Sequence, residues 1–440
     1  MADRQTCDLL LHADMVVTQD KERRILNSGS VAIEDGIVVS VGPSEKLEQA
    51  FAAREVVDLS GKLLMPGLVN AHCHAPMVLL RGIADDLPLM EWLEDNIWPV
   101  ERQLTKDLIG LGARLACAEM LRAGVTAFLD GYIHEQVVGA AVDAAGMRAV
   151  LGEGFFGFPS PMFPSAQHCW DSIKRIDRQF AGNCRIRSAV TPHAAFTVPP
   201  KYLVESYELA EGLDMPWQIH LAESPVETSV CLEKYGKRPV ELLYSLDILS
   251  DRVTLHHCVD VNDEEIALLA EKNVKVVHNP ASNLKLNSGM SPVQKMLDAG
   301  VVVGIGTDGA ASNNQLNMFR EMGLAALVGK VRSDDASAVN AQSVLDMATL
   351  NSARCLHWPE LGSIAEGCPA DMVALDLDSP NLQPLFNPVS QVVYASSGHE
   401  VSMTMVAGKV LYHEGAYRNF DVKALLQEVK QAQKWINAHR

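Results

Sequence analysis

The sequence Met65-Pro-Gly-Leu-Val-Asn-Ala-His-Cys-His74 joins an apolar run to a pair of histidines. The apolar residues that follow Pro66-Gly67 are typical of a buried strand. Because side chains alternate along a strand, His72 and His74 should point to one side and Cys73 to the other. Two imidazoles on one side can bind a single divalent transition metal. We therefore expect a metal site where this strand ends.

Three later apolar segments end in groups that can complete such a site. The first ends in His220 and Glu223, the second in His256 and His257, and the third in Asp308. A carboxylate after so apolar a run is costly unless it is paired or binds a metal, which favours Asp308 as a ligand. A metal hydrolase also needs a carboxyl group that exchanges protons beside the attacking water, and Glu223 is the candidate. Together these groups indicate a hydrolytic metalloenzyme.

Alternation of side chains leaves open which of the two adjacent histidines faces the site. In Val253–His257 the apolar residues should face the surrounding helices, which would turn His256 inward. If the strand ends at His256, however, the alternation no longer constrains His257. Both histidines therefore remain candidates.

Length, charge and cysteine content limit the class of protein. A chain of 440 residues can hold one large domain and a smaller one. Its net charge of −18 argues against nucleic acid as a partner, because proteins that bind nucleic acid present a basic surface. The nine cysteines are dispersed without paired spacing, which is typical of reduced thiols. No apolar run approaches the ~18 residues of a membrane span, and the first residues do not resemble a secretory signal. We expect a soluble, cytoplasmic protein that binds neither membrane nor nucleic acid.

The middle of the chain alternates β-branched runs with longer helical patterns. Eight β/α units over this length predict a (β/α)8 barrel of the TIM type. The candidate metal and acid groups all stand at the C-terminal ends of their strands, which is the face where barrel active sites form. The expected barrel strands are Leu68–His74, Val125–Asp130, Arg148–Phe155, Ile186–His193, Trp217–Leu221, Val253–His257, Val274–His278 and Val301–Thr307.

Both ends of the chain contain short β-branched runs that lead into turn formers, and Asp35-Gly36 predicts a hairpin. We expect an α/β fold in which residues 1–65 and 366–420 form a small β-sandwich domain. The barrel should occupy residues 66–365, and a C-terminal helix residues 421–440. The short runs are Leu9–Asp14, Met15–Thr18, Ser30–Gly36, Ile37–Gly42, Ala370–Asp376, Gln391–Tyr394 and Thr404–Tyr412.

Several motifs together resemble the amidohydrolase superfamily. They are Pro66–His74, His220-Leu-Ala-Glu223, His257-Cys-Val259, His278–Leu286 and Gly306-Thr-Asp-Gly309. The stretch Ala75–Leu93 is similar, more narrowly, to the 5′-methylthioadenosine/S-adenosylhomocysteine deaminases and their adenosine-deaminating relatives. The resemblance extends over essentially the whole chain.

The resemblance implies one divalent metal ion, zinc, in a (β/α)8 barrel. Its ligands would be His72, His74, His220 and Asp308. Binuclear relatives use a carboxylated lysine from the fourth barrel strand, whereas Ile186–Val198 contains no lysine and offers His193. We therefore expect a mononuclear site.

The resemblance also implies roles for the remaining site residues. Glu223 would protonate the purine ring, while Asp308 and His257 would take the proton of the attacking water. The family pattern matches His257 and not His256 after the sixth strand. The catalytic residues expected from the resemblance are thus Glu223, His257 and Asp308.

Three further residues are expected to contact the substrate. Glu101, in Trp98-Pro-Val-Glu, matches the family acid that binds the ribose hydroxyls, and His193 matches another substrate contact. Trp92 belongs to Leu87–Leu93, which follows the first barrel strand and should wall the mouth of the site with apolar groups.

The expected activity is hydrolytic removal of the 6-amino group from an adenosine-type nucleoside. Methylthioadenosine should be preferred, with adenosine and S-adenosylhomocysteine as further substrates, and a homo-oligomer is common in the family. The alternative within enzymes is a deaminase or hydrolase of guanine, a pterin or a triazine on the same metal site. A non-catalytic metal-binding protein is disfavoured, because it would need no proton shuttle at Glu223 and His257. The short-chain zinc deaminases are excluded, because their His-x-Glu…Pro-Cys-x-x-Cys signature is absent.

Overall fold

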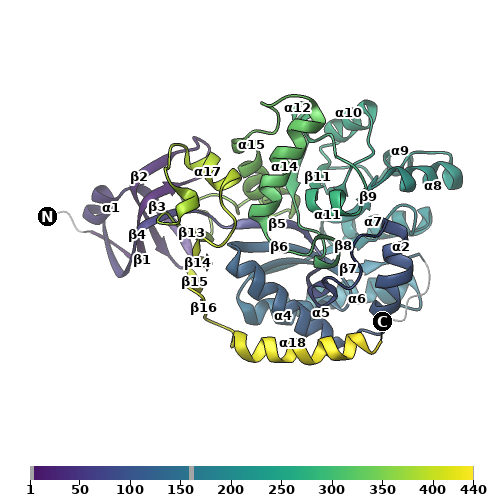
Figure 1. Ribbon diagram of the computed structural model, residues 1–440, viewed down its shortest axis with the longest axis horizontal. Helices are drawn as coiled ribbons and strands as arrows, with labels where there is room; N and C mark the ends of the chain where they lie inside the picture. Colours follow the sequence, from purple (N-terminus) through teal and green to yellow (C-terminus); the bar gives the residue numbers. More distant parts are fainter. Residues whose placement is uncertain (1–3, 158–162, 440) are drawn as a thin grey trace.

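Two eight-stranded sheets organise the chain. The computed structural model describes residues 4–157 and 163–439. Figure 1 places one sheet with its helices in a large barrel and the other in a smaller domain at the N-terminal end of the view. This confirms the predicted α/β architecture, a barrel joined to a β domain that both termini build.

The barrel sheet is parallel, and its strands neighbour one another in chain order. A backbone hydrogen bond of 3.0 Å from the Asp308 N–H to the His72 carbonyl links the residues after the last strand to the first strand. All eight predicted strands are present, with ends that differ by at most a few residues. They are β5 (Leu68–Cys73), β6 (Val125–Tyr132), β7 (Arg148–Phe155), β8 (Ile186–Pro192), β9 (Trp217–Leu221), β10 (Val253–His257), β11 (Lys275–His278) and β12 (Val302–Ile305).

Helices surround this sheet and follow its strands. At the N-termini of some of them a side chain accepts a hydrogen bond from an otherwise unsatisfied backbone N–H, as Thr105 does before α4 and Asn262 before α10. The helices of the outer ring are α4 (Lys106–Arg122), α5 (Glu135–Ala145), α6 (Ala166–Gln179), α7 (Pro200–Gly212), α8 (Pro225–Tyr235), α9 (Pro239–Ser245), α10 (Asp263–Glu271), α12 (Val293–Asp298), α14 (Met318–Ser333), α15 (Ala341–Asp346) and α16 (Ser352–Cys355).

Short helical segments occupy the loops at the carboxyl ends of the strands. The longest excursion follows β5 and consists of η1 (Ala75–Leu80), α2 (Leu89–Glu91), η2 (Trp92–Ile97) and α3 (Trp98–Glu101). The turn η2 has π-helical geometry just before Pro99, which has no N–H to donate. Later loops contain α11 (Pro280–Lys285) and α13 (Ala310–Asn313).

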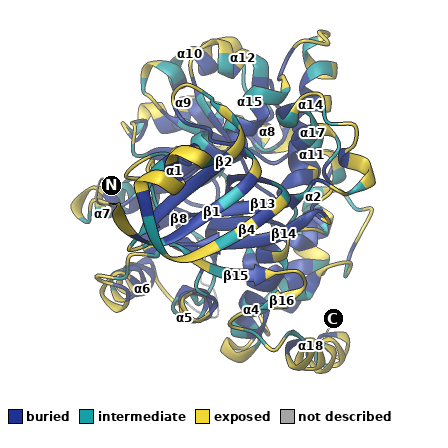
Figure 2. Cartoon of the chain, turned by 90° about the vertical axis from the view of Figure 1, so that its left-hand side faces the viewer, coloured by how far each residue is buried: buried dark blue, intermediate teal, exposed yellow. Residues whose placement is uncertain are grey.

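The second sheet is mixed and takes four strands from each end of the chain, in the order β16-β15-β14-β13-β4-β1-β2-β3. Antiparallel pairing of β4 with β13 joins the two contributions. Figure 2 shows the buried strands of this sheet beneath the exposed helix α1 (Ser44–Ala50). The strands are β1 (Gln5–Val17), β2 (Ile25–Glu34), β3 (Ile37–Pro43), β4 (Phe51–Pro66), β13 (Met372–Asp376), β14 (Val401–Val406), β15 (Lys409–His413) and β16 (Ala416–Tyr417).

Two details of the β domain differ from the sequence prediction. The runs Leu9–Asp14 and Met15–Thr18 belong to the single strand β1, whose register shifts between Ala13 and Met15 and so absorbs the polar Asp14. The run Gln391–Tyr394, predicted as extended, lies in helix α17 (Pro388–Tyr394). Asn387 caps this helix and Pro388 occupies its first turn, and these start signals outweigh the β-branched residues.

The two parts of the molecule are joined by a buried ion pair between Arg148 of β7 and Asp371, with an Nε–Oδ2 distance of 2.7 Å. The C-terminal helix α18 (Val422–Asn437) lies along α4, as Figure 1 shows. Among the described helices none has a run both long and apolar enough to span a membrane. The domain limits given above stay predictions.

Candidate active site

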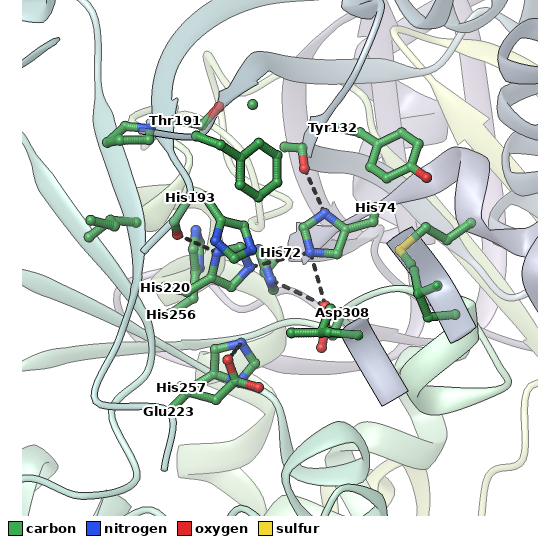
Figure 3. A pocket seen from close by; sticks show the side chains of 18 of the residues that line it. His72, His74, Tyr132, Thr191, His193, His220, Glu223, His256, His257 and Asp308 are labelled. Carbon is green, nitrogen blue, oxygen red and sulfur yellow. Dashed lines mark hydrogen bonds and ion pairs between the residues drawn. The ribbon is translucent and has the colours of Figure 1, made fainter. Parts of the chain in front are cut away.

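Four potential metal ligands meet at the carboxyl ends of the barrel strands. One ligand atom from each of His72, His74, His220 and Asp308 lies within 4.8 Å of the others. Asp308 Oδ1 lies 3.4 Å from His72 Nε2 and 3.2 Å from His74 Nε2. Figure 3 shows the three imidazoles gathered around this carboxylate. We call these four residues the ligand quartet.

Backbone carbonyls orient two of these rings. His74 Nδ1 lies 2.6 Å from the Gly131 carbonyl, and His220 Nδ1 lies 2.7 Å from the His193 carbonyl. A carbonyl only accepts, so each Nδ1 carries a proton and each Nε2 points to the centre of the quartet, where it can bind a metal once the ring is neutral. The two Nε2 atoms are 3.3 Å apart. Three imidazole nitrogens and one carboxylate suit a zinc ion.

Burial and mutual contact set the charges of the quartet. Burial lowers the pKa of His72 to about 3 and holds that of His220 well below its usual value, so both rings are neutral. Burial also disfavours the charged form of His74, but the hydrogen bond and charge of Asp308 outweigh it and raise its pKa to about 9. Contacts with His72 and His74 likewise outweigh burial at Asp308 and hold its pKa well below the ordinary range. Metal binding requires a neutral imidazole, so it would release the His74 proton.

Hydroxyl groups hold the carboxylate of Asp308 in place. Its Oδ2 accepts hydrogen bonds from Ser282 Oγ at 2.6 Å and from Ser312 Oγ at 2.9 Å. Its Oδ1 accepts from the Gly309 N–H at 2.8 Å. The orientation of this ligand is thus fixed by residues of two different loops.

Three residues with a strained backbone lie where the site side chains leave their strands. Ala222, His257 and Asp308 have positive φ values of 50°, 74° and 61°, although none is glycine. Such conformations persist only where surrounding contacts impose them. They turn Glu223, His257 and Asp308 away from the direction that strand alternation would give.

Glu223 and His257 form a pair beside the quartet, as Figure 3 shows. Glu223 Oε2 lies 3.9 Å from His257 Nε2. The opposite nitrogen of that ring, Nδ1, lies 2.8 Å from Asn283 Oδ1. The Glu223 N–H donates to Glu227 Oε2 at 2.8 Å, and burial raises the pKa of Glu223. Burial thus favours the protonated form of this carboxyl group, the form that a general acid needs.

The structure brings both adjacent histidines into the pocket. His256 points inward from β10, as alternation indicates, and its ring stacks on His72 with centroids 3.8 Å apart. His257 reaches the same pocket because its positive φ releases it from the alternation. The catalytic assignment of His257 stays a prediction.

The expected substrate contacts line the same pocket. Glu101 accepts a hydrogen bond of 2.5 Å from the Tyr132 hydroxyl, and burial raises its pKa. His193 Nδ1 lies 2.9 Å from Thr197 Oγ1. Trp92 is 5% exposed, and its indole Nε1 has no hydrogen-bond partner among the described residues. All the candidate residues named from the sequence therefore lie together, while their individual roles stay predictions.

Sequence reasoning missed Tyr132 and the groups that orient Asp308. The predicted strand stopped at Asp130 because Gly131 interrupts the β-branched run. The strand in fact continues to Tyr132, which lies two residues after Asp130 and so on the same face. Period-two counting would not have found it, because the residues of this strand that line the pocket before Tyr132 are Leu129 and Gly131, on the other face. Ser282 and Ser312 gave no comparable indication, because their contacts depend on how two loops pack.

A sequence profile of the amidohydrolase family matches residues 63–411. The chain belongs to the amidohydrolase family. One amidohydrolase relative, the 5-methylthioadenosine/S-adenosylhomocysteine deaminase of Nitratidesulfovibrio vulgaris (strain Miyazaki F), is 51% identical over 98% of each chain. The enzyme of the same name from Lawsonia intracellularis is 48% identical, again over 98% of each chain. The resemblance seen in the motifs is thereby confirmed.

A solved amidohydrolase structure is similar throughout. An adenosine deaminase from Xanthomonas campestris, solved with bound zinc, superposes with a TM-score of 0.97. It is 38% identical to this chain, and the match covers 99% of this chain and 100% of the other. A zinc ion in a protein of this fold agrees with the donor set of the ligand quartet, so a metal cofactor is supported for this amidohydrolase.

Proposed function

We propose that this chain catalyses hydrolytic deamination at C6 of an adenosine-type nucleoside, with 5′-methylthioadenosine preferred. Adenosine and S-adenosylhomocysteine are the further substrates. The single observation that carries the proposal is Glu101, a carboxylate that lines the same pocket as the ligand quartet and is oriented by Tyr132. A carboxylate there is suited to accept hydrogen bonds from both ribose hydroxyls, which a free base lacks. The names of the relatives support the same substrate class.

The ligand quartet fits one divalent metal, zinc, held by His72, His74, His220 and Asp308. Such an ion would supply Lewis-acid activation of the attacking water. Asp308 and His257 take a proton from that water. Its oxygen then adds to C6 of the purine.

Glu223 supplies the complementary proton. It protonates N1 of the ring as the new C6–O bond forms, so that no full negative charge accumulates on the base. The C6–N6 bond then breaks, and the amino group leaves as ammonia with a proton returned from the same side chains. The products are the inosine analogue and ammonia, which balances one nucleoside and one water. No covalent intermediate on the protein is needed.

Two further residues, Trp92 and His193, have polar atoms that a substrate could engage. Trp92 Nε1 is a buried donor with no partner in the described structure, and such a donor is costly unless a ligand accepts from it. His193 has one ring nitrogen occupied by Thr197, which leaves the other for the substrate. We assign both to substrate binding.

The rest of the pocket favours a neutral, apolar 5′ substituent. Its lining includes apolar side chains of the excursion after β5: Leu89, Trp92, Leu93, Ile97 and Trp98. Burial of one methylene-sized group contributes roughly 0.8 kcal/mol, or about a fourfold preference. No lysine or arginine is present among the described lining residues, and residues 158–162 contain none in their sequence. The zwitterionic tail of S-adenosylhomocysteine therefore lacks a cationic partner, and we rank it below methylthioadenosine.

The alternative substrates are guanine, pterins and triazines. The same metal ligands and proton shuttle would serve them, so those residues do not discriminate. Glu101 does, because none of these molecules carries a ribose. A cytoplasmic location and a homo-oligomeric state also stay predictions.

The test is direct. Zinc-loaded protein is incubated with methylthioadenosine, and the products are identified by mass spectrometry together with an ammonia assay. The proposal requires one ammonia per nucleoside and a gain of one mass unit as the amine becomes an oxo group. Absence of turnover with every nucleoside, in protein shown to contain one metal per chain, would overturn it.

A further inference from the structure

Three buried carboxyl side chains adjoin the strand ends that carry the site, yet the reaction described above uses none of them. They are Asp130 at the end of β6, Glu135 at the start of α5 and Glu153 in β7. Their exposures are 0%, 0% and 1%, so water does not offset the cost of burying them. Buried acids of this kind require an explanation from their contacts.

Each carboxyl group accepts hydrogen bonds from the backbone of the strand ends. Asp130 Oδ1 accepts from the Ala75 N–H at 2.6 Å, and Glu135 Oε1 from the Tyr132 N–H at 3.0 Å. Glu153 Oε1 accepts from the His134 N–H at 2.7 Å. The network therefore holds the residue that follows His74 and the whole segment 130–135.

Asp130 and Glu135 also influence each other. Asp130 Oδ2 and Glu135 Oε2 are buried and accept no hydrogen bond from the described residues, and each carboxyl group shifts the pKa of the other. Two adjoining buried carboxylates repel each other, so protonation of one of them is favoured. The pair therefore favours one charge in place of two. Burial favours this state, since it raises the pKa of Asp130 to about 6 and that of Glu135 well above its usual value.

The segment between the two acids carries two contacts to the site. The Gly131 carbonyl accepts from His74 Nδ1 at 2.6 Å, and the Tyr132 hydroxyl donates to Glu101. A shift of this segment would thus move a metal ligand and the ribose-binding carboxylate together.

We propose that the Asp130–Glu135 pair is a positioning element. It orients His74 for metal binding and, through Tyr132, orients Glu101 for contact with the ribose. The inference rests on the roles given to His74 and Glu101 in the proposed function. Neither acid touches the substrate or the metal ligands themselves. Their contribution passes through the Gly131 carbonyl and the Tyr132 side chain.

The test compares Glu135→Ala with Glu135→Gln. The alanine variant removes the acceptor of the Tyr132 N–H, whereas glutamine retains that acceptor and offers an amide hydrogen to the neighbouring Asp130. Glu265→Ala is the matched control. Glu265 is likewise a buried acid in the first turn of a helix, and it accepts from the Asn262 N–H at 2.9 Å and from Arg238, with no contact to the site.

Two quantities are measured on each variant. The first is zinc affinity, from competition with a chelator. The second is the ratio of kcat/KM for adenosine to that for 2′,3′-dideoxyadenosine. We expect Glu135→Ala to lose roughly 10- to 100-fold in zinc affinity, the usual effect of removing a partner behind a ligand, and to lose most of the ribose preference. Glu135→Gln should stay within about threefold of wild type in both.

The proposal is overturned if Glu135→Ala lowers thermal stability like Glu265→Ala but keeps wild-type zinc affinity and ribose preference. It is equally overturned if Glu135→Gln is as damaging as alanine. Should the alanine variant not fold, Glu135→Asp takes its place, since the shorter side chain cannot keep both contacts. If wild type has the same kcat/KM for adenosine and 2′,3′-dideoxyadenosine, Glu101 does not bind the ribose hydroxyls. The zinc affinities alone then test whether the pair positions His74.

Discussion

Asp308 and His72 are joined twice. The Asp308 N–H donates to the His72 carbonyl at 3.0 Å, and the Asp308 Oδ1 lies 3.4 Å from His72 Nε2. The first contact links the two ends of the barrel sheet, and the second belongs to the ligand quartet. One pair of residues therefore takes part both in the closure of the barrel and in the assembly of the metal site.

This coupling predicts that metal binding stabilises the fold. Free zinc at about 100 times its dissociation constant should add about 2.7 kcal/mol to the free energy of unfolding. Removal of metal with a chelator should therefore lower Tm, and readdition of zinc should restore it. His220→Ala should abolish zinc retention and turnover, and its Tm should no longer respond to zinc. A wild-type Tm that does not change when zinc is removed or added would contradict the coupling.

Replacement of the proposed proton donor should separate chemistry from metal binding. Glu223→Gln should keep one zinc per chain and lose ~10²- to 10⁴-fold in kcat, the usual scale of general acid–base catalysis. Metal analysis and steady-state kinetics on the same preparation are the measurements. Near-normal turnover would remove Glu223 from the mechanism.

The pH dependence of activity should also identify Glu223 as the proton donor. Glu223 acts in its protonated form, so activity falls on the alkaline side as it loses its proton. Burial raises the pKa of this carboxyl group, which moves that limb to higher pH than an exposed glutamate would give. The residual activity of Glu223→Gln should lack the alkaline limb in a plot of log kcat/KM against pH. An unchanged limb would assign it to another group.

The two adjacent histidines can be distinguished by matched substitutions. His257→Asn removes the ring beside Glu223, whereas His256→Asn removes a ring that stacks on His72. We expect the first to lower kcat by at least ~10²-fold and the second to change it far less. Zinc content should be measured in both. If only His256→Asn cripples the enzyme, the assignment taken from the family resemblance is wrong.

Ribose recognition should depend on Glu101 and, less strongly, on Tyr132. A hydrogen bond to a charged group contributes about 1.5–3 kcal/mol, so Glu101→Gln should lose roughly 10- to 100-fold in kcat/KM for adenosine. The loss should be smaller with 2′,3′-dideoxyadenosine, which lacks both hydroxyls. Tyr132→Phe should show the same pattern at lower magnitude. Equal losses on both substrates would show that Glu101 has a structural role instead.

The sequence was sufficient to predict the barrel because each of its strands is a short β-branched run that ends near a turn or a polar group. His72, His74 and the position of Asp308 after an apolar strand indicated a metal site, and the resemblance to the amidohydrolases implied the full quartet with His220. Local pattern failed where tertiary contacts decide. The four residues Gln391–Tyr394 are too few to distinguish a helical from a strand periodicity. Asn387 and Pro388 start a helix there. The burial of Asp130 and Glu135 beside the site depends on how α5 packs against the barrel, which the local sequence does not reveal.

The central claim is that the pocket is built for a nucleoside. Steady-state kcat/KM values of the zinc-loaded enzyme should be compared for methylthioadenosine, adenosine, S-adenosylhomocysteine, adenine and guanine. The account predicts methylthioadenosine at least equal to adenosine, S-adenosylhomocysteine below methylthioadenosine, adenine poor and guanine inert. Guanine or a pterin as the best substrate would contradict the nucleoside assignment and leave only the amidohydrolase fold and its metal site standing.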